Sequence, residues 1–183
     1  MLFEFFNFLY TSALGVVKTA DDGNVGGITF DVDGSDGSHY EMTTDSTGYA
    51  QIDDLPVYTA DGSAKIVYTV TERVPLRYEA QNPQEVVLAE DGNDIITYVQ
   101  FDNITKKSFY IIQKWAEDFA VEGLRFAISG SDGTYQEAVS DANGLVMFEN
   151  LPVYDKNDAN IIYTAYEINT PDRYHTPKAI DNI

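Results

Sequence analysis

The chain has 183 residues and a formal net charge of −19, and 44% of its residues are hydrophobic. That apolar fraction is normal for a globular protein and argues against a disordered chain. The negative charge excludes nucleic acid and anionic membrane surfaces as expected partners, because both would repel it. No stretch is long and apolar enough for a transmembrane helix. The chain has no cysteine, so its stability must come from its core or from a cross-link other than a disulfide.

Short alternating segments separated by Gly, Asp and Asn turns predict strands along the whole chain, and no segment keeps a helical period. After a first strand around Val16 and Lys18, the predicted strands are 28–32, 40–44, 50–52, 66–72, 85–88 and 95–101. Further along, they are 124–129, 136–139, 145–148 and 161–167. Many short strands joined by tight turns predict an all-β sandwich or barrel.

The second half of the chain repeats the first. Residues 27–30 (GITF) recur as 123–126 (GLRF), 34–37 (GSDG) as 130–133, and 55–58 (LPVY) as 151–154. Each repeat has the size of a small domain and can bury its own core. A tandem repeat is typical of a stalk, a fibre or a multivalent binder, and we do not expect an enzyme.

Three polar side chains of the first repeat fall in the register of core residues. Lys18 shares a strand face with Val16, and Glu72 and Asn103 share faces with the apolar residues of their own strands. Burying a charge without a partner is costly, so three such groups in one core need a reason. From register alone, one interpretation is a buried Lys–Glu ion pair with the asparagine as a hydrogen-bond partner.

Each repeat resembles a Cna protein B-type domain, also called the SpaA-like or prealbumin-like domain of Gram-positive surface proteins and pili. The matching segments are 17–21 (VKTAD), 27–30 (GITF), 44–48 (TDSTG), 55–56 (LP), 68–72 (YTVTE) and 101–103 (FDN). The resemblance implies two tandem prealbumin-like (Ig-like) β-sandwich domains in an extracellular protein of the cell surface or cell wall. It also implies an isopeptide bond between Lys18 and Asn103, with Glu72 as its promoter.

The implied chemistry agrees with an apolar interior. Apolar surroundings lower the pKa of an amine and raise that of a carboxylic acid, and a neutral amine is a nucleophile. A protonated carboxyl group can polarise the carboxamide and pass a proton to the leaving ammonia. Folding supplies the proximity, so we expect a single-turnover reaction with no cofactor and no metal.

The second repeat has Lys114 and Glu167 in the same register, but its last strand, with the asparagine, would fall beyond residue 183. The start of the chain carries the missing pattern, because Phe3, Phe5 and Asn7 would share one strand face. We therefore predict that residues 1–10 are the last strand of a preceding or partner unit. Residues 11–104 are then the first domain, and residues 105–183 are a second domain without its last strand.

Two interpretations of this arrangement remain. The chain is a fragment of a longer array, or residues 1–7 of one molecule complete the second unit of another by strand addition. In the second case Phe3 and Phe5 enter the partner's core, and Lys114 bonds Asn7 with Glu167 as promoter. Head-to-tail contacts of this kind produce filaments.

The sequence thus predicts a structural subunit of a bacterial stalk, pilus or filament that associates with itself. The alternative function is an adhesin or carbohydrate-binding repeat that binds a host or glycan ligand through loop residues such as Tyr58 and Tyr154. Residues 31–37 resemble a calcium loop, but their glycine is misplaced for an EF-hand and a hairpin turn is the simpler interpretation. His39 and His175 are predicted to be surface residues.

Overall fold

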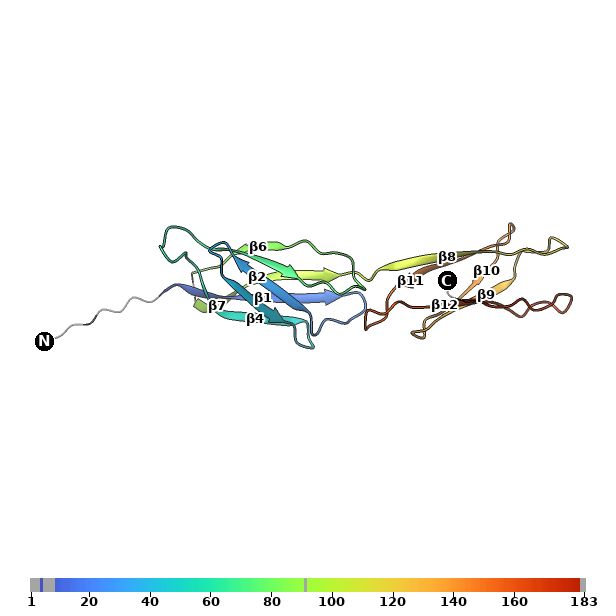
Figure 1. Cartoon of the computed structure of the whole chain (residues 1–183), viewed down its shortest axis with the longest axis horizontal. Coiled ribbons are helices and arrows are strands. Elements are labelled where there is room, and N and C mark those ends of the chain that lie inside the picture. Colours follow the sequence, from blue (N-terminus) through green and yellow to red (C-terminus); the bar gives the residue numbers. More distant parts are fainter. Residues whose placement is uncertain (1–3, 5–8, 91, 182–183) are drawn as a thin grey trace. The chain divides into compact units, whose positions relative to one another are not determined.

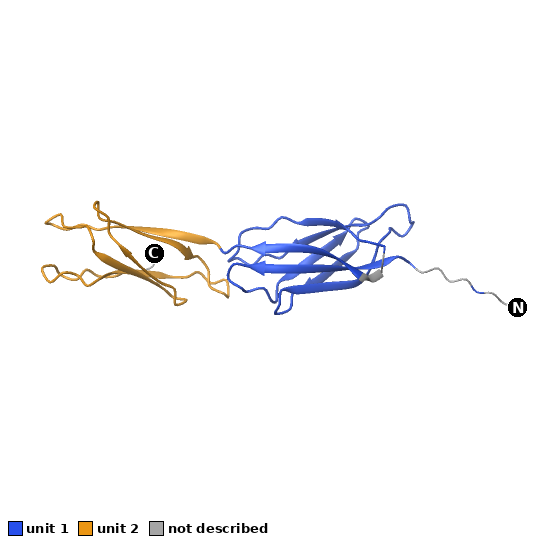
Figure 2. Cartoon of the chain, turned by 180° about the vertical axis from the view of Figure 1, so that it is seen from behind, with its two compact units in different colours: residues 1–105 blue, residues 106–183 orange. Residues whose placement is uncertain are grey.

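The computed structural model describes residues 4, 9–90 and 92–181, and for residues 92–94 and 181 the backbone alone. These residues form strands joined by turns, and none of them belongs to a helix that could cross a membrane. The predicted all-β class is confirmed. The chain divides into two compact units, Met1–Thr105 and Lys106–Ile183 (Figure 2).

The first unit contains two sheets. Its strands are β1 (Thr11–Ala20), β2 (Thr29–Gly34), β3 (His39–Thr43), β4 (Tyr49–Pro56), β5 (Val67–Glu72), β6 (Gln84–Val87) and β7 (Gly92–Asn103). One sheet is three-stranded with the order β4-β1-β7, and the other is four-stranded with the order β3-β2-β5-β6 (Figure 1). β1 pairs in parallel with β7, whereas its other neighbour, β4, is antiparallel.

The core of the first unit lies between these sheets. Leu14 and Val16 of β1 have no exposed surface and pack in one cluster with the inward residues of β2 and β5. Across this cluster, the ring of Phe30 on β2 lies 5.0 Å from that of Phe101 on β7. The alternation of apolar and polar residues along the strands therefore gives each sheet one inward apolar face.

The second unit repeats this plan with fewer described strands. They are β8 (Lys107–Gln113), β9 (Arg125–Gly130), β10 (Tyr135–Val139), β11 (Leu145–Pro152), β12 (Tyr163–Ile168) and β13 (Ile180–Asp181). β10, β9, β12 and β13 form a four-stranded sheet, and β11 pairs with β8 in a two-stranded sheet. The core between them includes Phe126, Ile128, Phe148, Leu151, Ile161 and Tyr163.

The two units differ at one sheet edge. β1 is hydrogen-bonded on both sides, whereas β8 is hydrogen-bonded only to β11 within the described ranges (Figure 1). Tyr110 and Ile112, the inward residues of β8, are only partly buried. On the outward face of β8, Phe109 and Ile111 are 61% and 51% exposed. The second core is therefore open along β8 in the described part of the chain.

The prediction for residues 1–10 concerns mostly residues that the structure does not describe. Phe3, Phe5 and Asn7 lie outside the described residues. Their assignment to a last strand therefore stays a prediction, as does the strand-donation interpretation that depends on it.

Candidate functional site

The first unit brings Lys18, Glu72 and Asn103 together in its interior. All three side chains are buried. Lys18 Nζ lies 3.3 Å from Glu72 Oε2, and Asn103 Nδ2 donates a hydrogen bond of 2.6 Å to Glu72 Oε1. Lys18 Nζ also donates to the backbone carbonyl of Phe101 at 3.1 Å. The carboxylate thus lies between the amine and the carboxamide and contacts both.

Strand pairing sets this geometry. β1 and β7 are parallel, and Lys18 is paired with Phe101 while Ala20 is paired with Asn103. The side chains of Lys18 and Asn103 therefore lie at the same end of the sheet. Glu72 enters from the opposite sheet, where it is paired with Phe30 of β2. The three groups therefore meet only when both sheets have formed and packed.

Asp21, just after β1, fastens the end of β7 beside the site. Its backbone N–H donates to the Asn103 carbonyl at 3.1 Å. Its carboxylate accepts hydrogen bonds of 2.9 and 3.0 Å from the backbone and hydroxyl of Thr105. These bonds hold Asn103 in place from the backbone side, and the sequence reasoning did not anticipate them.

Burial disfavours the charged form of the Lys18 amine. Burial lowers the pKa of Lys18, and the nearby carboxylates of Glu72 and Asp102 only partly oppose this. Asn103 Oδ1 is buried and accepts no hydrogen bond from any described residue. A proton passed from Lys18 to Glu72 would leave an uncharged amine beside a carboxamide, with a carboxyl group able to hydrogen-bond it. The arrangement can therefore support amide formation between the two side chains.

The second unit holds two of the three groups. Lys114 Nζ lies 2.7 Å from Glu167 Oε2, and their side chains are 14% and 1% exposed. Glu167 Oε1 is buried and has no hydrogen-bond partner among the residues that the structure describes. Beside the pair is a pocket of about 200 Å³, whose lining includes Ile112 and Phe126. The place that Asn103 takes against Glu72 has no counterpart among the described residues of this unit.

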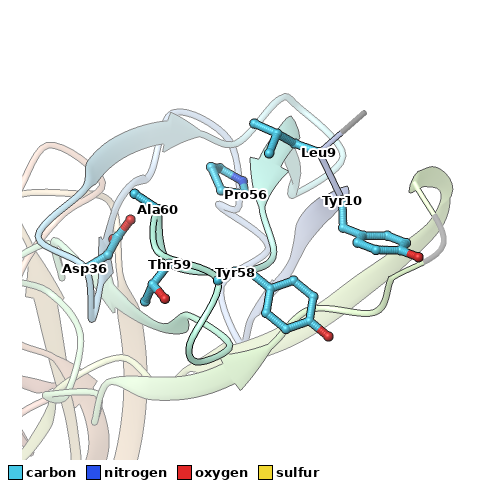
Figure 3. Close-up of a pocket in the computed structure, with 8 residues that line it drawn as sticks. Leu9, Tyr10, Asp36, Pro56, Tyr58, Thr59 and Ala60 are labelled. Atoms are coloured by element: carbon cyan, nitrogen blue, oxygen red, sulfur yellow. The ribbon is translucent and has the colours of Figure 1, made fainter. Parts of the chain in front are cut away.

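The tyrosines predicted to bind a ligand lie in different surroundings. Tyr58 lines a surface pocket of about 570 Å³ together with Leu9 and Tyr10, and the rings of Tyr10 and Tyr58 lie 6.1 Å apart on one side of it (Figure 3). The Tyr58 hydroxyl donates to Glu90 at 2.7 Å. Both rings have a lysine ammonium 5.8 Å from their centroids, Lys65 at Tyr58 and Lys106 at Tyr154. Leu9 and Tyr10 were missed because they precede the first predicted strand.

The region predicted to be a plain hairpin turn forms one. Gly34 N–H donates to the carbonyl of Ser38 at 2.8 Å, as the turn between β2 and β3 requires. Next to it, Asp31, His39 and Glu41 have potential ligand atoms within 4.8 Å of one another. The Arg73 guanidinium donates to Asp31 and Glu41, so a cation of the protein already lies among these groups. His39 and His175 are both exposed.

Comparison with known proteins identifies the fold. No family model matches the sequence, and no curated protein matches it. Among solved structures, the chain is similar to the Bacillus anthracis TIE protein, with a TM-score of 0.65, 20% identity, and coverage of 94% of this chain and 31% of that chain. It is also similar to the C-terminal fragment of pilus adhesin SpaC from Lactobacillus rhamnosus GG, with a TM-score of 0.59, 15% identity, and coverage of 95% and 80%.

These similarities establish a shared fold. The chain has the all-β architecture seen in a pilus adhesin fragment, and it spans less than a third of the TIE protein, at 31%. The identities are too low for function to follow from the likeness.

Proposed function

We propose that the chain is a structural subunit of a bacterial cell-surface stalk, pilus or filament, and that an isopeptide bond joins Lys18 to Asn103. The observation that carries this proposal is the buried contact of Glu72 with both reacting groups, at 3.3 Å and 2.6 Å. The fold shared with a pilus adhesin fragment supports the surface role. In this proposal the two repeats are tandem prealbumin-like domains.

The bond would form in the folded interior without a cofactor. Lys18 first passes a proton to Glu72, which leaves both groups neutral. Nζ then attacks the Asn103 carboxamide carbon. The Nζ–Cγ bond forms, the Cγ–Nδ2 bond breaks, and Nδ2 leaves as ammonia after receiving one proton from Nζ by way of Glu72. The product is an amide that joins the first and last strands of the unit.

Intact-mass measurement tests this step. The purified chain should weigh less than its sequence mass by one ammonia, and digestion should release a branched peptide that contains Lys18 and Asn103. Glu72→Ala should have the full sequence mass while Asn143→Ala, at an exposed turn, keeps the loss. Full sequence mass in a folded, unaltered chain would overturn the proposal.

We further propose that the second unit is completed by residues 1–7 of another copy, so that subunits associate head to tail. Three observations on the described residues support this: one edge of β8 is unpaired, a pocket lies beside Ile112, and the buried Glu167 Oε1 has no donor. Phe3 and Phe5 would fill the core, and Asn7 would bond Lys114. Covalent ladders in denaturing gels are expected, and a strictly monomeric chain at high concentration would contradict the proposal.

An adhesin function is the second candidate, and the pocket at Tyr10 and Tyr58 favours it. Two tyrosine rings beside a pocket of about 570 Å³ offer stacking surfaces for a sugar ring. A host or glycan ligand would then bind there. Retention on a glycan array that Tyr58→Ala abolishes and Tyr154→Ala leaves unchanged would support this function, and no retention of the unaltered chain would contradict it.

A further inference from the structure

Gly15, in the middle of β1, makes room for an aromatic ring from the neighbouring strand. It is paired with Tyr98 of β7. A Cβ atom at Gly15 would lie 2.8 Å from two ring carbons of Tyr98 and 3.1 Å from a methyl group of Ile96. The 2.8 Å contacts are shorter than real Cβ atoms show and the 3.1 Å contact is tight, so a side chain here would displace the ring. Glycine at this place and tyrosine opposite it are therefore matched.

The corresponding place in the second unit is not a glycine. Ile111 takes the place of Gly15, since β8 pairs with β11 through Ile111 and Met147 as β1 pairs with β4 through Gly15 and Gln51. Ile111 is 51% exposed on the outward face of β8. A strand that adds to this edge in the manner of β7 must carry a residue opposite Ile111 that leaves space for its branched side chain.

We propose that Ile111 selects the strand that completes the second unit, and that this strand is residues 2–7 of a second copy, parallel to β8. The register of β1 and β7 transfers directly, placing Leu2 opposite Ile111 and Phe5 opposite Lys114. The inference rests on the proposed head-to-tail association and specifies its register and its selectivity.

The register places the donor's side chains against groups that need them. Phe5 takes the place of Phe101 and meets Phe126, as Phe101 meets Phe30 in the first unit. Asn7 takes the place of Asn103, so its carboxamide nitrogen can donate to Glu167 Oε1, which is buried and has no hydrogen-bond partner in the described ranges. One strand in one register thus supplies a hydrogen-bond donor for Glu167 Oε1 and an aromatic ring for the place beside Phe126.

The same register rejects the competing strand. A second copy's β7 also carries the aromatic residue and the asparagine, but it has Tyr98 where residues 2–7 have Leu2. The Tyr98 ring needs the space that Gly15 leaves empty and that the Ile111 side chain fills. Ile111 therefore directs the open edge towards the start of the chain and away from strands of the β7 kind.

The covalent step follows the scheme of the first unit. Lys114 gives a proton to Glu167, and Nζ attacks the Asn7 carboxamide carbon. The Nζ–Cγ bond forms, the Cγ–Nδ2 bond breaks, and ammonia leaves with one proton from Nζ carried by Glu167. The reaction waits for the donor strand, since Lys114 and Glu167 alone have no carboxamide to attack.

A complementary pair of full-length variants tests the proposal. Asn7→Ala can only accept a strand covalently, and Lys114→Arg can only donate one, so neither can react with itself. An equimolar mixture should give a single covalent 1:1 product that has lost one intersubunit ammonia, with its branched peptide joining Lys114 to Asn7. Adding Leu2→Tyr to the donor should lower the yield about tenfold or more, whereas the volume-conserving Leu2→Met should not.

The role of Ile111 is tested by asking whether a smaller residue at this position restores coupling to the Leu2→Tyr donor. Adding Ile111→Gly to the acceptor, or Ile111→Ala if the glycine variant folds poorly, should restore coupling to the Leu2→Tyr donor. Equal coupling of both donors to the unaltered Ile111, or no rescue by either smaller residue, overturns the selectivity. No product from any pair overturns strand donation as well. The structural-subunit proposal is then tested separately, by measuring whether the chain loses one ammonia at Lys18 and Asn103.

Discussion

The carboxamide of Asn103 donates a hydrogen bond of 2.6 Å to the carboxylate of Glu72 across the interior of the first unit. The equivalent glutamate of the second unit, Glu167, has a buried oxygen that accepts no hydrogen bond from any residue that the structure describes. Within the described residues, one chain therefore contains one site with all three groups and one site with two of them.

Replacing Asn103 with Ala should destabilise the first unit strongly, because the proposed cross-link between β1 and β7 could not form. A cross-link that closes a loop of this length stabilises a fold by on the order of 4 kcal/mol in the chain-entropy account. Urea denaturation should show this loss in the free energy of unfolding. Asn143→Ala is the matched control and should change the midpoint little. Equal stabilities would mean that no cross-link forms in the unaltered chain.

Backbone amides of β8 should exchange with solvent faster than those of β1. Both sides of β1 are hydrogen-bonded, whereas β8 is bonded only to β11 in the described part of the chain. Local opening is easier where fewer buried contacts oppose it. Hydrogen–deuterium exchange followed by mass spectrometry measures the difference at low protein concentration. Raising the concentration should then protect β8 if another copy adds a strand, and unchanged exchange would argue against that addition.

Gly15→Ile should destabilise the first unit by about 1–3 kcal/mol, because its side chain would overlap the Tyr98 ring. Tyr98→Leu in the same chain should recover most of this loss, since the pair then resembles Ile111 and its proposed partner. Thermal unfolding of the two single variants and the double variant gives the coupling free energy between positions 15 and 98. Additive effects of the two substitutions would contradict a direct contact between these positions.

The free energy of unfolding should fall on acidification, because Asp22 loses its negative charge. Burial pushes the pKa of Asp22 upward, but hydrogen bonds from Asn24 and Tyr78, with the nearby charge of Arg77, hold it below its ordinary value of 3.8. The carboxylate's stabilising effect is therefore fully present above about pH 4 and is lost as the pH falls below the folded-state pKa. Asp22→Asn should lower the free energy of unfolding at pH 7 and match the unaltered chain near pH 2.

Urea titrations at both pH values check this prediction. Tyr78 has a pKa raised to about 12 by burial and by its bond to Asp22, so it keeps its proton throughout this range. Asn143→Ala, at an exposed turn, is the control and should leave the difference between the two pH values unchanged, because it removes no titratable group. An Asp22→Asn deficit that persists undiminished at pH 2 would contradict the assignment.

The sequence predicted the strands well where alternation was clean and less well where polar residues interrupted a strand. The expected strand 50–52 is only part of β4, which continues to Pro56. Asp53 and Asp54 are residue types that strands disfavour. Asp54 nevertheless remains in the strand with a positive φ of 59°, where the pairing with β1 shifts register. A bulge therefore extends β4 through residues whose types indicate a turn.

Contacts between distant strands were harder to predict. The inward register of Lys18 followed from its neighbours on one strand, so the sequence could place it in the core. The match of Gly15 to Tyr98 depends on the parallel register of β1 and β7, which no local pattern specifies. The only local signal was a glycine within an apolar strand. The Asp21 contacts with Thr105 were missed for the same reason, since they join residues far apart in the sequence.

The parallel pairing of β1 with β7 has a mechanical consequence. Tension applied at the beginning of β1 and at the end of β7 would slide the two strands past each other. Their hydrogen bonds would then bear the load in shear, all together, whereas an antiparallel hairpin pulled at its open end would release its bonds one after another. The backbone pairing of β1 with β7 is thus enough by itself to make the first unit resist tension in shear, without a covalent cross-link.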